Sequence, residues 1–505
     1  MSTPTHAMER AVPVAAAGTS VDVAALLAKL GARPRRLTSD SRRVEPGVAF
    51  AAYPGTHADG RAFVPDAIAR GAAAVLWEPR GFAWDPRWTA PNLGVEGLQA
   101  WVGPIADFIY GSPSQRLWMA GVTGTNGKTS CAHWIAQAMD GCGRRAAILG
   151  TLGNGLVGAI APATHTTPDA AALHELLAQF EAAGAQAVAM EVSSHGLDQG
   201  RVNAVKFDVA LFTNLTRDHL DYHRTMAAYA ATKARLFAWP GLRTAVVNAD
   251  DAFGQRLIDD ARARGGHVLT YGMGAADIAA GGMRLHADGM TLDVATPWGP
   301  AELVAPVIGA FNALNLLGVL GVLLASDVPL TRAVAALARI APPPGRMQRF
   351  GGEGMPTVIV DYAHTPDALE QALRALRPAV AAERELVCVF GCGGDRDPGK
   401  RPEMGAIAAR LADRIVVTTD NPRGEDPEAI ASAVARGIRE VGNRRWSIEH
   451  DRRAAIRGAI ATARAGDLVL VAGKGHETYQ ERSGVRSPFS DAAEAAAALA
   501  GRGPG

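Results

Sequence analysis

The chain has 505 residues, and at about one domain per 150 residues it is expected to form three domains. Its 51 Lys and Arg residues balance 50 Asp and Glu residues, so the formal net charge is +1. This balance gives no general attraction to nucleic acid or to an anionic membrane, so an anionic ligand must be held by a local site.

Cysteine use and hydropathy bear on the compartment in which the chain works. The four cysteines are too few and too scattered for a disulfide framework, and Cys388 and Cys392 are expected to be small buried residues rather than zinc ligands. No segment approaches the ~18 consecutive apolar residues that a membrane-spanning helix needs. Residues 1–20 contain an Ala/Val run that is short for a secretory signal, and we predict a disordered extension there. The expectation is a cytoplasmic protein.

Three stretches of the chain differ in pattern, and we interpret them as domains. Residues 21–112 alternate short strands and helices; in "FVPDAIARGAAAVLWE" a helix pattern is followed by a Gly stop and an apolar strand. Residues 113–345 repeat strand, Gly-rich turn and helix. Residues 346–505 hold four apolar runs that end in polar residues, as parallel strands do at their carboxyl ends. The predicted fold class is α/β, with a smaller N-terminal domain and two larger domains with mostly parallel sheets.

The strongest single motif, "GVTGTNGKT", begins at Gly121 and lies between an apolar strand and a helix. A turn of backbone N–H groups that leads into a helix suits a polyphosphate. Lys128 is expected to reach the β- and γ-phosphates, and the Thr129 hydroxyl to hold Mg²⁺. The usual pattern has Gly where Val122 stands, so a glycine turn without ligand is the alternative, but the flanking elements favour a nucleotide. The predicted ATP contacts in this loop are Gly124, Thr125, Asn126, Gly127, Lys128, Thr129 and Ser130.

Three further residues of the central stretch are candidates for catalysis. Glu191 ends the apolar run "AVAME" and is expected to share Mg²⁺ with Thr129; a carboxylate that caps a turn is the alternative. His219 follows the next apolar strand, which should neighbour the phosphate loop. Lys233 lies in "YAATKARLF", and its pattern alone favours a solvated helix lysine.

Taken in order, these motifs resemble those of the Mur ligase family. They are "GVTGTNGKTS", "MEVSSHGL", "FTNLTRDHLDYH", "YAATKARLF", "FNALNLLG", "PPPGRMQ" and "DYAHTPDAL", while "GCGGDRDPGKRPEM", "DNPRGEDP" and "AGKGHE" resemble the branch that adds the third amino acid of the peptide stem. The resemblance runs from about residue 37 to residue 491. It implies a first domain that binds a UDP-sugar, a central P-loop ATPase and a Rossmann-like C-terminal domain that brings the incoming amino acid. It also implies a role in peptidoglycan synthesis, and so in cell shape and division.

The resemblance also implies which residues contact the ligands. The uridine-diphosphate contacts would be Ser39, Ser41, Thr56, His57 and Ala58, and the muramoyl-dipeptide contacts Thr166, Thr167, Ser193, Gln199 and Arg201. Asn312 would meet adenine, while Arg346 and Asp361 would belong to the nucleotide site across the domain junction. His364 would be either a polar contact at that junction or a structural residue.

The resemblance changes the interpretation of Lys233, because the family carries a carbamylated lysine at this position. One Mg²⁺ would then lie between Thr129 and Glu191, and a second between His219 and the Lys233 carbamate. Together with Lys128, the residues Glu191, His219 and Lys233 are the predicted catalytic set, with ATP and Mg²⁺ as cofactors.

The motif Asp420-Asn421-Pro422-Arg423 discriminates between amino-acid acceptors. It follows the strand "RIVVTT", and an arginine there can hold a carboxylate by two parallel hydrogen bonds. Meso-2,6-diaminopimelate has a carboxylate at its far end and lysine has none, so Arg423 favours diaminopimelate. By the resemblance Arg396 would bind the same ligand, with Gly473 and Glu477 at its distal amino group.

The implied reaction is an ATP-dependent amide ligation. The D-glutamyl γ-carboxylate of UDP-N-acetylmuramoyl-L-alanyl-D-glutamate would be phosphorylated by ATP, and the amine of diaminopimelate would displace the phosphate. We expect a monomer with these small-molecule partners and without nucleic acid or membrane insertion.

Three alternatives remain open at the level of sequence. A folylpolyglutamate synthetase-type ligase shares the chemistry but should lack the DNPR loop and the N-terminal segment from "SDSR" to "GTHADG". A lysine-adding ligase of the same branch is nearer, and Arg423 argues against it. A nucleotide-binding regulator without catalysis would not need to keep both predicted metal sites.

Overall fold

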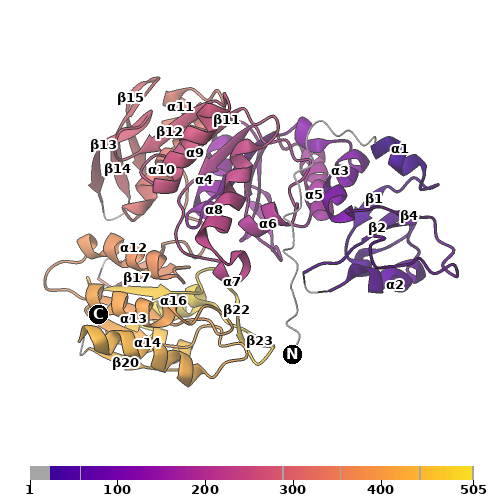
Figure 1. Ribbon diagram of the computed structural model, residues 1–505. Helices are drawn as coiled ribbons and strands as arrows, with labels where there is room; N and C mark the ends of the chain where they lie inside the picture. The colour runs from indigo at the N-terminus through magenta and orange to yellow at the C-terminus, as the bar shows by residue number, and fades with distance from the viewer. Residues whose placement is uncertain (1–22, 57, 287–288, 353, 443–444, 503–505) are drawn as a thin grey trace.

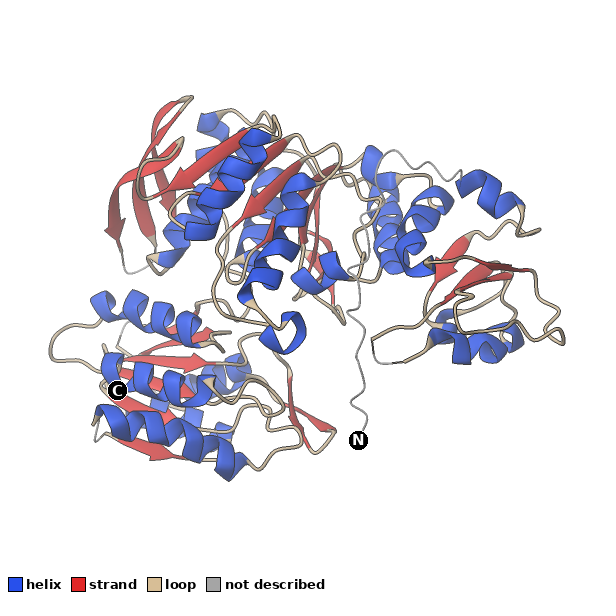
Figure 2. Cartoon of the chain, in the orientation of Figure 1, coloured by secondary structure: helices blue, strands red, loops and turns tan. Residues whose placement is uncertain are grey.

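The computed structural model describes residues 23–56, 58–286, 289–352, 354–442 and 445–502. Figure 1 shows three bodies in chain order, the N-terminal one on the right, the central one at upper left and the C-terminal one at lower left. Each is built around its own sheet, and Figure 2 shows helices packed against each of them. The domain limits at 112 and 345 stay predictions, and the predicted extension at 1–20 lies outside the described residues.

The N-terminal body is a four-stranded parallel sheet of order β1-β2-β3-β4. Its strand β2 is buried along its whole length, between a core that includes α1 and α3 and a smaller core that includes α2. The helix and strand predicted in "FVPDAIARGAAAVLWE" are α2 and β3. The elements are α1 (Val23–Ala28), β1 (Arg36–Thr38), η1 (Ser41–Arg43), β2 (Val48–Ala52), η2 (Gly60–Phe63), α2 (Val64–Ala69), β3 (Ala74–Trp77), β4 (Asn92–Gly94), α3 (Leu98–Ile109) and η3 (Pro113–Gln115).

The central body is an eleven-stranded sheet of order β15-β14-β13-β12-β11-β10-β5-β9-β6-β7-β8. The strands are β5 (Trp118–Thr123), β6 (Ala146–Gly150), β7 (Gly153–Leu156), β8 (Ala159–Ala161), β9 (Ala187–Glu191), β10 (Val209–Phe212), β11 (Thr244–Asn248), β12 (Val268–Gly272), β13 (Ile278–Leu285), β14 (Met290–Thr296) and β15 (Gly299–Ala305). The helices are α4 (Lys128–Gly141), α5 (Ala170–Ala182), α6 (Ser194–Asp198), α7 (Leu220–His223), α8 (Met226–Ala234), η4 (Arg235–Ala238), α9 (Ala252–Ala263), α10 (Phe311–Leu324) and α11 (Leu330–Leu337).

Both faces of the parallel part of this sheet are buried. Along β9, Ala187 and Ala189 pack into the core with α4 and α10, whereas Val188 and Met190 pack into the core with α5 and α9. Such strands read as continuous apolar runs, which is why they were recognisable in sequence. Because β10, β5 and β9 are adjacent and parallel, the loops at their carboxyl ends meet at one edge.

The central sheet is mostly parallel, as predicted, but its outer strands are antiparallel. Strands β13 to β15 and β6 to β8 pair antiparallel. In β14, the exposed Asp293 and Ala295 alternate with the buried Leu292 and Val294, as in a sheet with one solvated face. Figure 1 shows β13, β14 and β15 at the edge of the central body, away from the N-terminal body.

The C-terminal body is a six-stranded sheet of order β16-β17-β21-β18-β19-β20, with a separate hairpin of β22 and β23. The four predicted apolar strands are β17, β18, β19 and β21. Helices α12, α13 and α14 contribute to the core on one face, and α15 and α16 to the core on the other. The elements are β16 (Gln348–Gly351), β17 (Thr357–Asp361), α12 (Pro366–Leu376), η5 (Arg377–Ala379), β18 (Leu386–Phe390), α13 (Lys400–Leu411), β19 (Arg414–Val417), α14 (Pro427–Val441), β20 (Trp446–Ile448), α15 (Arg452–Thr462), β21 (Leu468–Ala472), β22 (Tyr479–Arg482), β23 (Val485–Pro488) and α16 (Asp491–Ala500).

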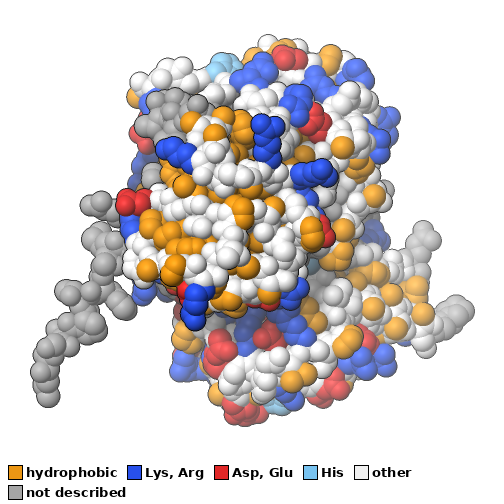
Figure 3. All heavy atoms as spheres, turned by 90° about the vertical axis from the view of Figure 1, so that its right-hand side faces the viewer, with side chains coloured by type: hydrophobic (Ala, Val, Ile, Leu, Met, Phe, Trp, Pro, Cys, Tyr) orange, Lys and Arg blue, Asp and Glu red, His pale blue; other side chains and the backbone are white. Residues whose placement is uncertain are grey.

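Three further observations concern the cysteines, the hydropathy of the helices and the surface charge. Cys388 and Cys392 are buried, as predicted for small apolar residues. None of the described helices combines the length and apolar character needed to cross a bilayer. Figure 3 shows basic and acidic side chains interspersed over the face it presents, in keeping with a net charge of +1.

Candidate active site

The phosphate loop joins the carboxyl end of β5 to the N-terminus of α4, the predicted strand–turn–helix arrangement. Gly127 has a φ of 85° just before the helix, and a Cβ on Gly124 would collide with the Thr213 hydroxyl. The loop is held from β10's side: Thr213 Oγ1 donates to the Asn126 carbonyl at 2.6 Å, and Asn126 N donates to Asn214 Oδ1 at 2.9 Å. These hydrogen bonds hold the loop against the segment that follows β10.

Two lysines converge on this loop. Lys128 Nζ donates to the carbonyl oxygens of Gly124 and Thr125 at 2.8 Å each, and Lys233 Nζ donates to the same Gly124 oxygen at 2.7 Å. Lys233 is 1% exposed, so it is not the solvated helix lysine that its pattern alone favoured. Burial lowers the pKa of Lys128, and burial together with the charge of Lys128 lowers the pKa of Lys233 well below its ordinary value.

Glu191 lies at the end of β9, beside the start of α4. It is 1% exposed, and its Oε2 accepts hydrogen bonds from Thr129 Oγ1 at 2.9 Å and from Thr151 Oγ1 at 3.1 Å. Its Oε1 accepts from the Thr151 backbone N–H at 2.8 Å. Arg346, just before β16, donates to Thr129 Oγ1 at 3.2 Å, and its guanidinium lies 4.6 Å from the centroid of the Tyr362 ring. The predicted Thr129–Glu191 pair is thus in contact, with an arginine from across the domain junction.

His219 lies close to the two lysines, in a cluster of aromatic rings. Burial is the main cause that lowers its pKa to about 4, and Lys128 and Lys233 act in the same direction. Its ring centroid is 4.9 Å from that of His195 and 6.0 Å from that of Tyr229. The imidazole is therefore neutral at pH 7, with a nitrogen lone pair available to a metal ion. Among the described residues, no three His, Cys, Asp or Glu side chains are grouped so that they could hold a metal ion.

The residues predicted to contact the muramoyl-dipeptide form one connected strip next to Glu191. Thr167 Oγ1 donates to the Glu191 carbonyl at 2.9 Å, and Ser193 N donates to Thr167 Oγ1 at 3.0 Å. Arg201 donates to the Thr167 carbonyl at 2.8 Å and also binds Gln199 Oε1. Thr166 lies on the same strip, since its hydroxyl is 3.0 Å from that of Thr151.

The predicted uridine-diphosphate residues border this strip from the N-terminal body. Ser39 Oγ donates to Asp169 Oδ1 at 3.3 Å, and Gln199 Nε2 donates to Thr56 Oγ1 at 3.4 Å. The two bodies therefore meet where the resemblance expects one elongated substrate. Ser41 is buried at the start of η1, Ala58 is exposed, and His57 lies outside the described residues.

The predicted nucleotide residues on the far side of the loop are hydrogen-bonded within the protein; Asn312 is buried and Asp361 is partly buried. Asn312 donates to the Ile308 carbonyl at 2.8 Å and accepts from Asn315 Nδ2 at 2.9 Å. Asp361 accepts from the Met347 N–H at 2.8 Å, and burial raises its pKa. His364 is partly buried and its Nδ1 lies 2.9 Å from the Tyr362 carbonyl oxygen. The contact of Asn312 to adenine and the place of Asp361 in the nucleotide site stay predictions.

The predicted diaminopimelate residues gather at the carboxyl ends of three adjacent strands, β18, β19 and β21. A Cβ on Gly393 would lie 2.9 Å from an Arg423 nitrogen and 3.9 Å from the side chain of Arg396, so both guanidinium-bearing side chains flank this turn. Arg396 is exposed, whereas Arg423 is partly buried and donates to the Gly394 carbonyl at 2.8 Å. Pro422 is buried behind the same turn, since its carbonyl crowds Gly394.

The other half of this group is acidic. Asn421 Nδ2 donates to Glu477 Oε2 at 2.7 Å. Gly473 has a φ of 118°, and a Cβ there would lie 2.5 Å from the Asp420 carboxylate, so glycine lets the backbone approach that side chain. One end of the group offers guanidinium donors and the other offers carboxylate acceptors.

Comparisons with known proteins address which family has this arrangement. Models for the Mur ligase family catalytic domain, the Mur ligase middle domain and the Mur ligase glutamate ligase domain match residues 35–110, 122–323 and 345–475. The UDP-N-acetylmuramoyl-L-alanyl-D-glutamate–2,6-diaminopimelate ligase of Chromobacterium violaceum is 53% identical over 468 residues, which cover 92% of this chain and 94% of that protein. The chain belongs to the Mur ligase family.

Solved structures agree with this membership. A structure of a UDP-N-acetylmuramoyl-L-alanyl-D-glutamate–2,6-diaminopimelate ligase superposes with a TM-score of 0.67 at 37% identity, covering 93% of this chain and 95% of that one. The folylpolyglutamate synthase of Mycobacterium tuberculosis has a TM-score of 0.63 at 21% identity, covering 80% of this chain and 96% of that one. The second likeness shows a shared fold alone.

Several polar residues of this Mur ligase site were not predicted from its sequence. Thr151 and Asp169 hold predicted residues through hydrogen bonds, and each lies in a loop with no motif of its own. His195 follows two serines in "MEVSSHGL", so the motif could have suggested it. Lys474 was present in the quoted "AGKGHE" motif but was given no role.

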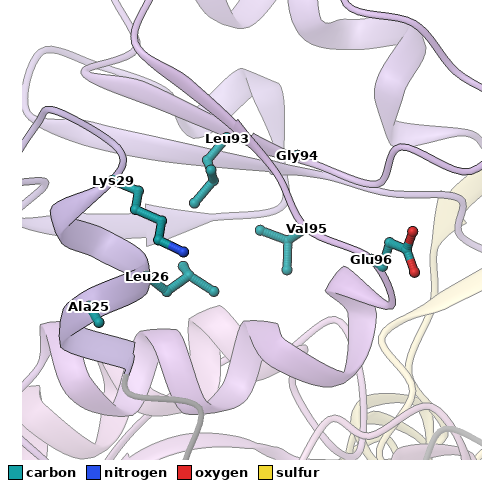
Figure 4. Close-up of a pocket in the computed structure, with 7 residues that line it drawn as sticks. All are labelled: Ala25, Leu26, Lys29, Leu93, Gly94, Val95 and Glu96. Atoms are coloured by element: carbon teal, nitrogen blue, oxygen red, sulfur yellow. The ribbon is translucent and has the colours of Figure 1, made fainter.

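The Mur ligase chain also has a cavity away from all of these residues. It measures about 330 Å³ and lies between α1 and the end of β4. Figure 4 shows Leu26, Lys29, Leu93 and Val95 around it. None of the predicted UDP contacts among the described residues lines it, so it does not mark the site.

Proposed function

We propose that the protein is an ATP-dependent ligase that joins meso-2,6-diaminopimelate to the D-glutamyl γ-carboxylate of UDP-N-acetylmuramoyl-L-alanyl-D-glutamate, a step in peptidoglycan precursor synthesis. The residues predicted to bind diaminopimelate, together called the acceptor pocket from here on, carry this proposal. Arg396 and Arg423 flank one glycine turn, and Asn421 links that turn to the Glu477 carboxylate. Guanidinium groups suit the carboxylates of a diamino dicarboxylic acid, and Glu477 suits an ammonium group. Relatives that match nearly the whole chain bear the name of this activity.

ATP is the phosphoryl donor in this proposal. Backbone N–H groups at the N-terminus of α4 bind its phosphates, and Lys128 exchanges its bonds to the Gly124 and Thr125 carbonyls for the β- and γ-phosphate oxygens. Burial lowers the pKa of Lys128 because it disfavours the charged form of the amine. The negative charge of the phosphates stabilises that charged form.

The residues around the loop suit Mg²⁺. Thr129 and Glu191 supply adjacent oxygen donors, 2.9 Å apart, which is the ligand chemistry that Mg²⁺ prefers. His219 with Lys233 as a carbamate would hold a second ion. Mg²⁺ bound there supplies positive charge that neutralises phosphoryl oxygens.

Carbamylation of Lys233 is supported by its surroundings. The reaction joins the neutral amine to CO₂, forms an N–C bond and releases one proton, so it needs an unprotonated lysine. Burial and Lys128 lower the pKa of Lys233, which favours the neutral amine at pH 7. With ¹³C-bicarbonate, a carbamate carbon resonance is expected in the wild type and not in Lys233→Arg; the same resonance in both proteins would refute the assignment.

The chemistry then follows in two balanced steps. The γ-carboxylate attacks the γ-phosphorus of ATP, and the bond to ADP breaks to give an acyl phosphate. The acceptor amine attacks the acyl carbon, phosphate leaves and the amine releases a proton. Arg201 and Ser193 orient the dipeptide, and Arg346 reaches Thr129 across the domain junction, a contact that helps to keep water from the acyl phosphate.

The decisive experiment supplies ATP, Mg²⁺ and the UDP-dipeptide with either meso-diaminopimelate or L-lysine, and identifies the product by mass. A tripeptide product with diaminopimelate and little with lysine is expected. Product only with lysine would overturn the role of Arg423. No product and no ADP with either acceptor would refute the ligase assignment and leave a nucleotide-binding protein.

The assembly and compartment belong to the same proposal. We expect a monomer that works in the cytoplasm, where ATP and its UDP-linked substrate are both available. Light scattering coupled to size-exclusion chromatography should give a mass near 52.6 kDa. A mass of twice that value at assay concentrations would contradict the monomer.

A further inference from the structure

Lys474 is a fully buried lysine at the carboxyl end of β21, immediately after Gly473. Its side chain is 0% exposed, although a buried ammonium is unfavourable unless polar groups surround it. Nothing in the proposed chemistry uses it. Such a residue is retained either for the fold or for the pocket that it supports.

The polar partners of Lys474 all belong to the acceptor pocket. Its Nζ donates to Glu477 Oε2 at 2.8 Å and to Asn421 Oδ1 at 3.0 Å, and it lies 4.0 Å from Asp420 Oδ1. Asn421 Nδ2 also donates to Glu477 Oε2, at 2.7 Å. Lys474, Asn421 and Glu477 therefore form a closed triangle of hydrogen bonds.

The two carboxylate oxygens of Glu477 differ in their hydrogen-bond partners. Oε2 accepts from both Lys474 and Asn421, whereas Oε1 accepts from no other residue in the part of the chain that the structure describes. The carboxylate is thus held by one oxygen, and the other remains available for an ammonium group. Asn421 is fixed as well, because its Oδ1 also accepts from the Glu481 N–H at 2.9 Å.

The hairpin of β22 and β23 extends the same support to Arg423. Arg423 N donates to the Glu481 carbonyl at 3.2 Å, and Ser483 N donates to the Arg423 carbonyl at 2.7 Å. The Lys474 ammonium lies 5.6 Å from the ring centroid of Tyr479, which begins β22. Lys474 therefore contacts the Asp420–Asn421 loop, Glu477 and the start of the hairpin.

We propose that Lys474 is a positioning residue for acceptor specificity. It orients Glu477 so that one oxygen faces the ammonium group of the diamino acid, and it fixes Asn421 in the loop that carries Arg423. The proposal rests on the proposed function, because it assumes that this pocket binds the acceptor. Lys474 acts through Glu477 and Asn421 and does not itself contact the substrate.

The first test is Lys474→Met, which keeps a long apolar stem and removes the charge. We expect the KM for diaminopimelate to rise about 30-fold, because the partly buried Glu477 carboxylate loses a charged partner. The KM values for ATP and the UDP-dipeptide should stay within about twofold. Lys206→Met, at a partly exposed lysine of the central body, is the matched control and should leave all three KM values unchanged. Equal increases in all three in Lys474→Met would mean a general structural role and would overturn the proposal.

A double variant keeps the test decisive if Lys474→Met fails to fold. Glu477→Gln removes the charge that Lys474 balances, so Lys474→Met should be tolerated in that background. If Lys474 acts through Glu477, the KM for diaminopimelate in the double variant should lie within about twofold of that in Glu477→Gln alone. A further 30-fold increase would overturn the proposal. Failure of the wild type to make the tripeptide would instead refute the proposed function, whatever the variants do.

Discussion

The phosphate loop of the central body and the acceptor pocket of the C-terminal body both contain lysine amines that are buried or partly buried, but they balance the charge differently. Lys128 and Lys233 share the Gly124 carbonyl, and in the part of the chain that the structure describes neither lies within ion-pair distance of a carboxylate. Lys474 lies 2.8 Å from Glu477 and 3.0 Å from Asn421. In the central site the charges of Glu191 and Asp218 act on the lysines only from beyond ion-pair distance until an anionic ligand binds, whereas the acceptor pocket pairs Lys474 internally.

This difference separates two ways of building a binding site. A site with an excess of cationic groups is unfavourable without its ligand and gains charge balance when a polyphosphate or a carbamate is present. A pocket whose charges are already paired is rigid beforehand and binds a zwitterion by geometry. Substitutions should therefore trade stability against activity in the central site, and should change acceptor binding in the C-terminal pocket.

The largest effect is expected for Lys128→Met. Activity should fall by about 10³-fold, because the transferred phosphoryl group loses a positioned charge. The thermal midpoint of the ligand-free protein should stay equal or rise, because an incompletely balanced ammonium has been removed. ADP release and differential scanning fluorimetry measure the two effects, with Lys206→Met as the control. A lower midpoint together with lost activity would break the comparison, since it would mean that Lys128 also stabilises the ligand-free loop.

Arg423→Lys tests the acceptor pocket. We expect the KM for diaminopimelate to rise about 30-fold, roughly 2 kcal/mol, because lysine cannot reproduce a bidentate guanidinium–carboxylate contact. The low activity with L-lysine should not fall, since that acceptor lacks the second carboxylate. Arg439→Lys, on the surface of α14 against Trp446, is the control. An equal loss of activity with both acceptors would show that Arg423 shapes the pocket but does not bind the distal carboxylate.

A pH experiment compares His133 of α4 with His476, which lies between Lys474 and Glu477. His133 is 4% exposed, and burial, followed by the charge of Arg346, lowers its pKa to about 4. As the pH falls below about 6.5 the unfolded chain binds the proton first, so stability present above pH 6.5 is lost toward pH 4. His133→Gln should reduce the drop in unfolding free energy between pH 7 and pH 5 by about 2 kcal/mol.

The acceptor-loop histidine should have a smaller effect. His476 has a pKa lowered to about 3, mainly by burial, but it remains partly exposed, so water screens its charge. The change in His476→Gln should be less than that in His133→Gln. Chemical denaturation at the two pH values, followed by fluorescence, measures both, and identical pH dependence in His133→Gln and the wild type would contradict the expected titration.

Local sequence patterns predicted the backbone structure around the phosphate loop but not the surroundings of Lys233. The strand, turn and helix around Lys128 and the position of Glu191 follow from local patterns, because a phosphate loop is continuous in sequence. The burial of Lys233 could not be read from "YAATKARLF", because it depends on where α8 packs against the loop. Only the family resemblance gave that lysine a role.

For the acceptor pocket, the sequence predicted the position of the loops but not the contacts between them. Its loops were correctly expected at the carboxyl ends of parallel strands, and the DNPR loop was singled out. The triangle of Lys474, Asn421 and Glu477 joins residues 53 and 56 positions apart, so no local pattern contains it. The antiparallel edges of the central sheet were missed for a related reason, since strand direction depends on pairing and not on hydropathy.

The smallest effect is expected where the two regions touch. Asn126 of the phosphate loop donates to Asp367 Oδ2 of α12 at 2.8 Å, a neutral donor on a partly buried carboxyl whose pKa is raised chiefly by burial. Asp367→Ala removes one such bond, worth about 1 kcal/mol, so the KM for ATP should rise about fivefold while the KM for diaminopimelate stays unchanged. Glu370→Ala on the same helix, which removes only an exposed pair with Arg374, should change neither. If the KM for diaminopimelate rose with that for ATP, the junction would couple the two regions. The phosphate loop and the acceptor pocket would then act as one site, and the contrast in how they balance charge would no longer separate them.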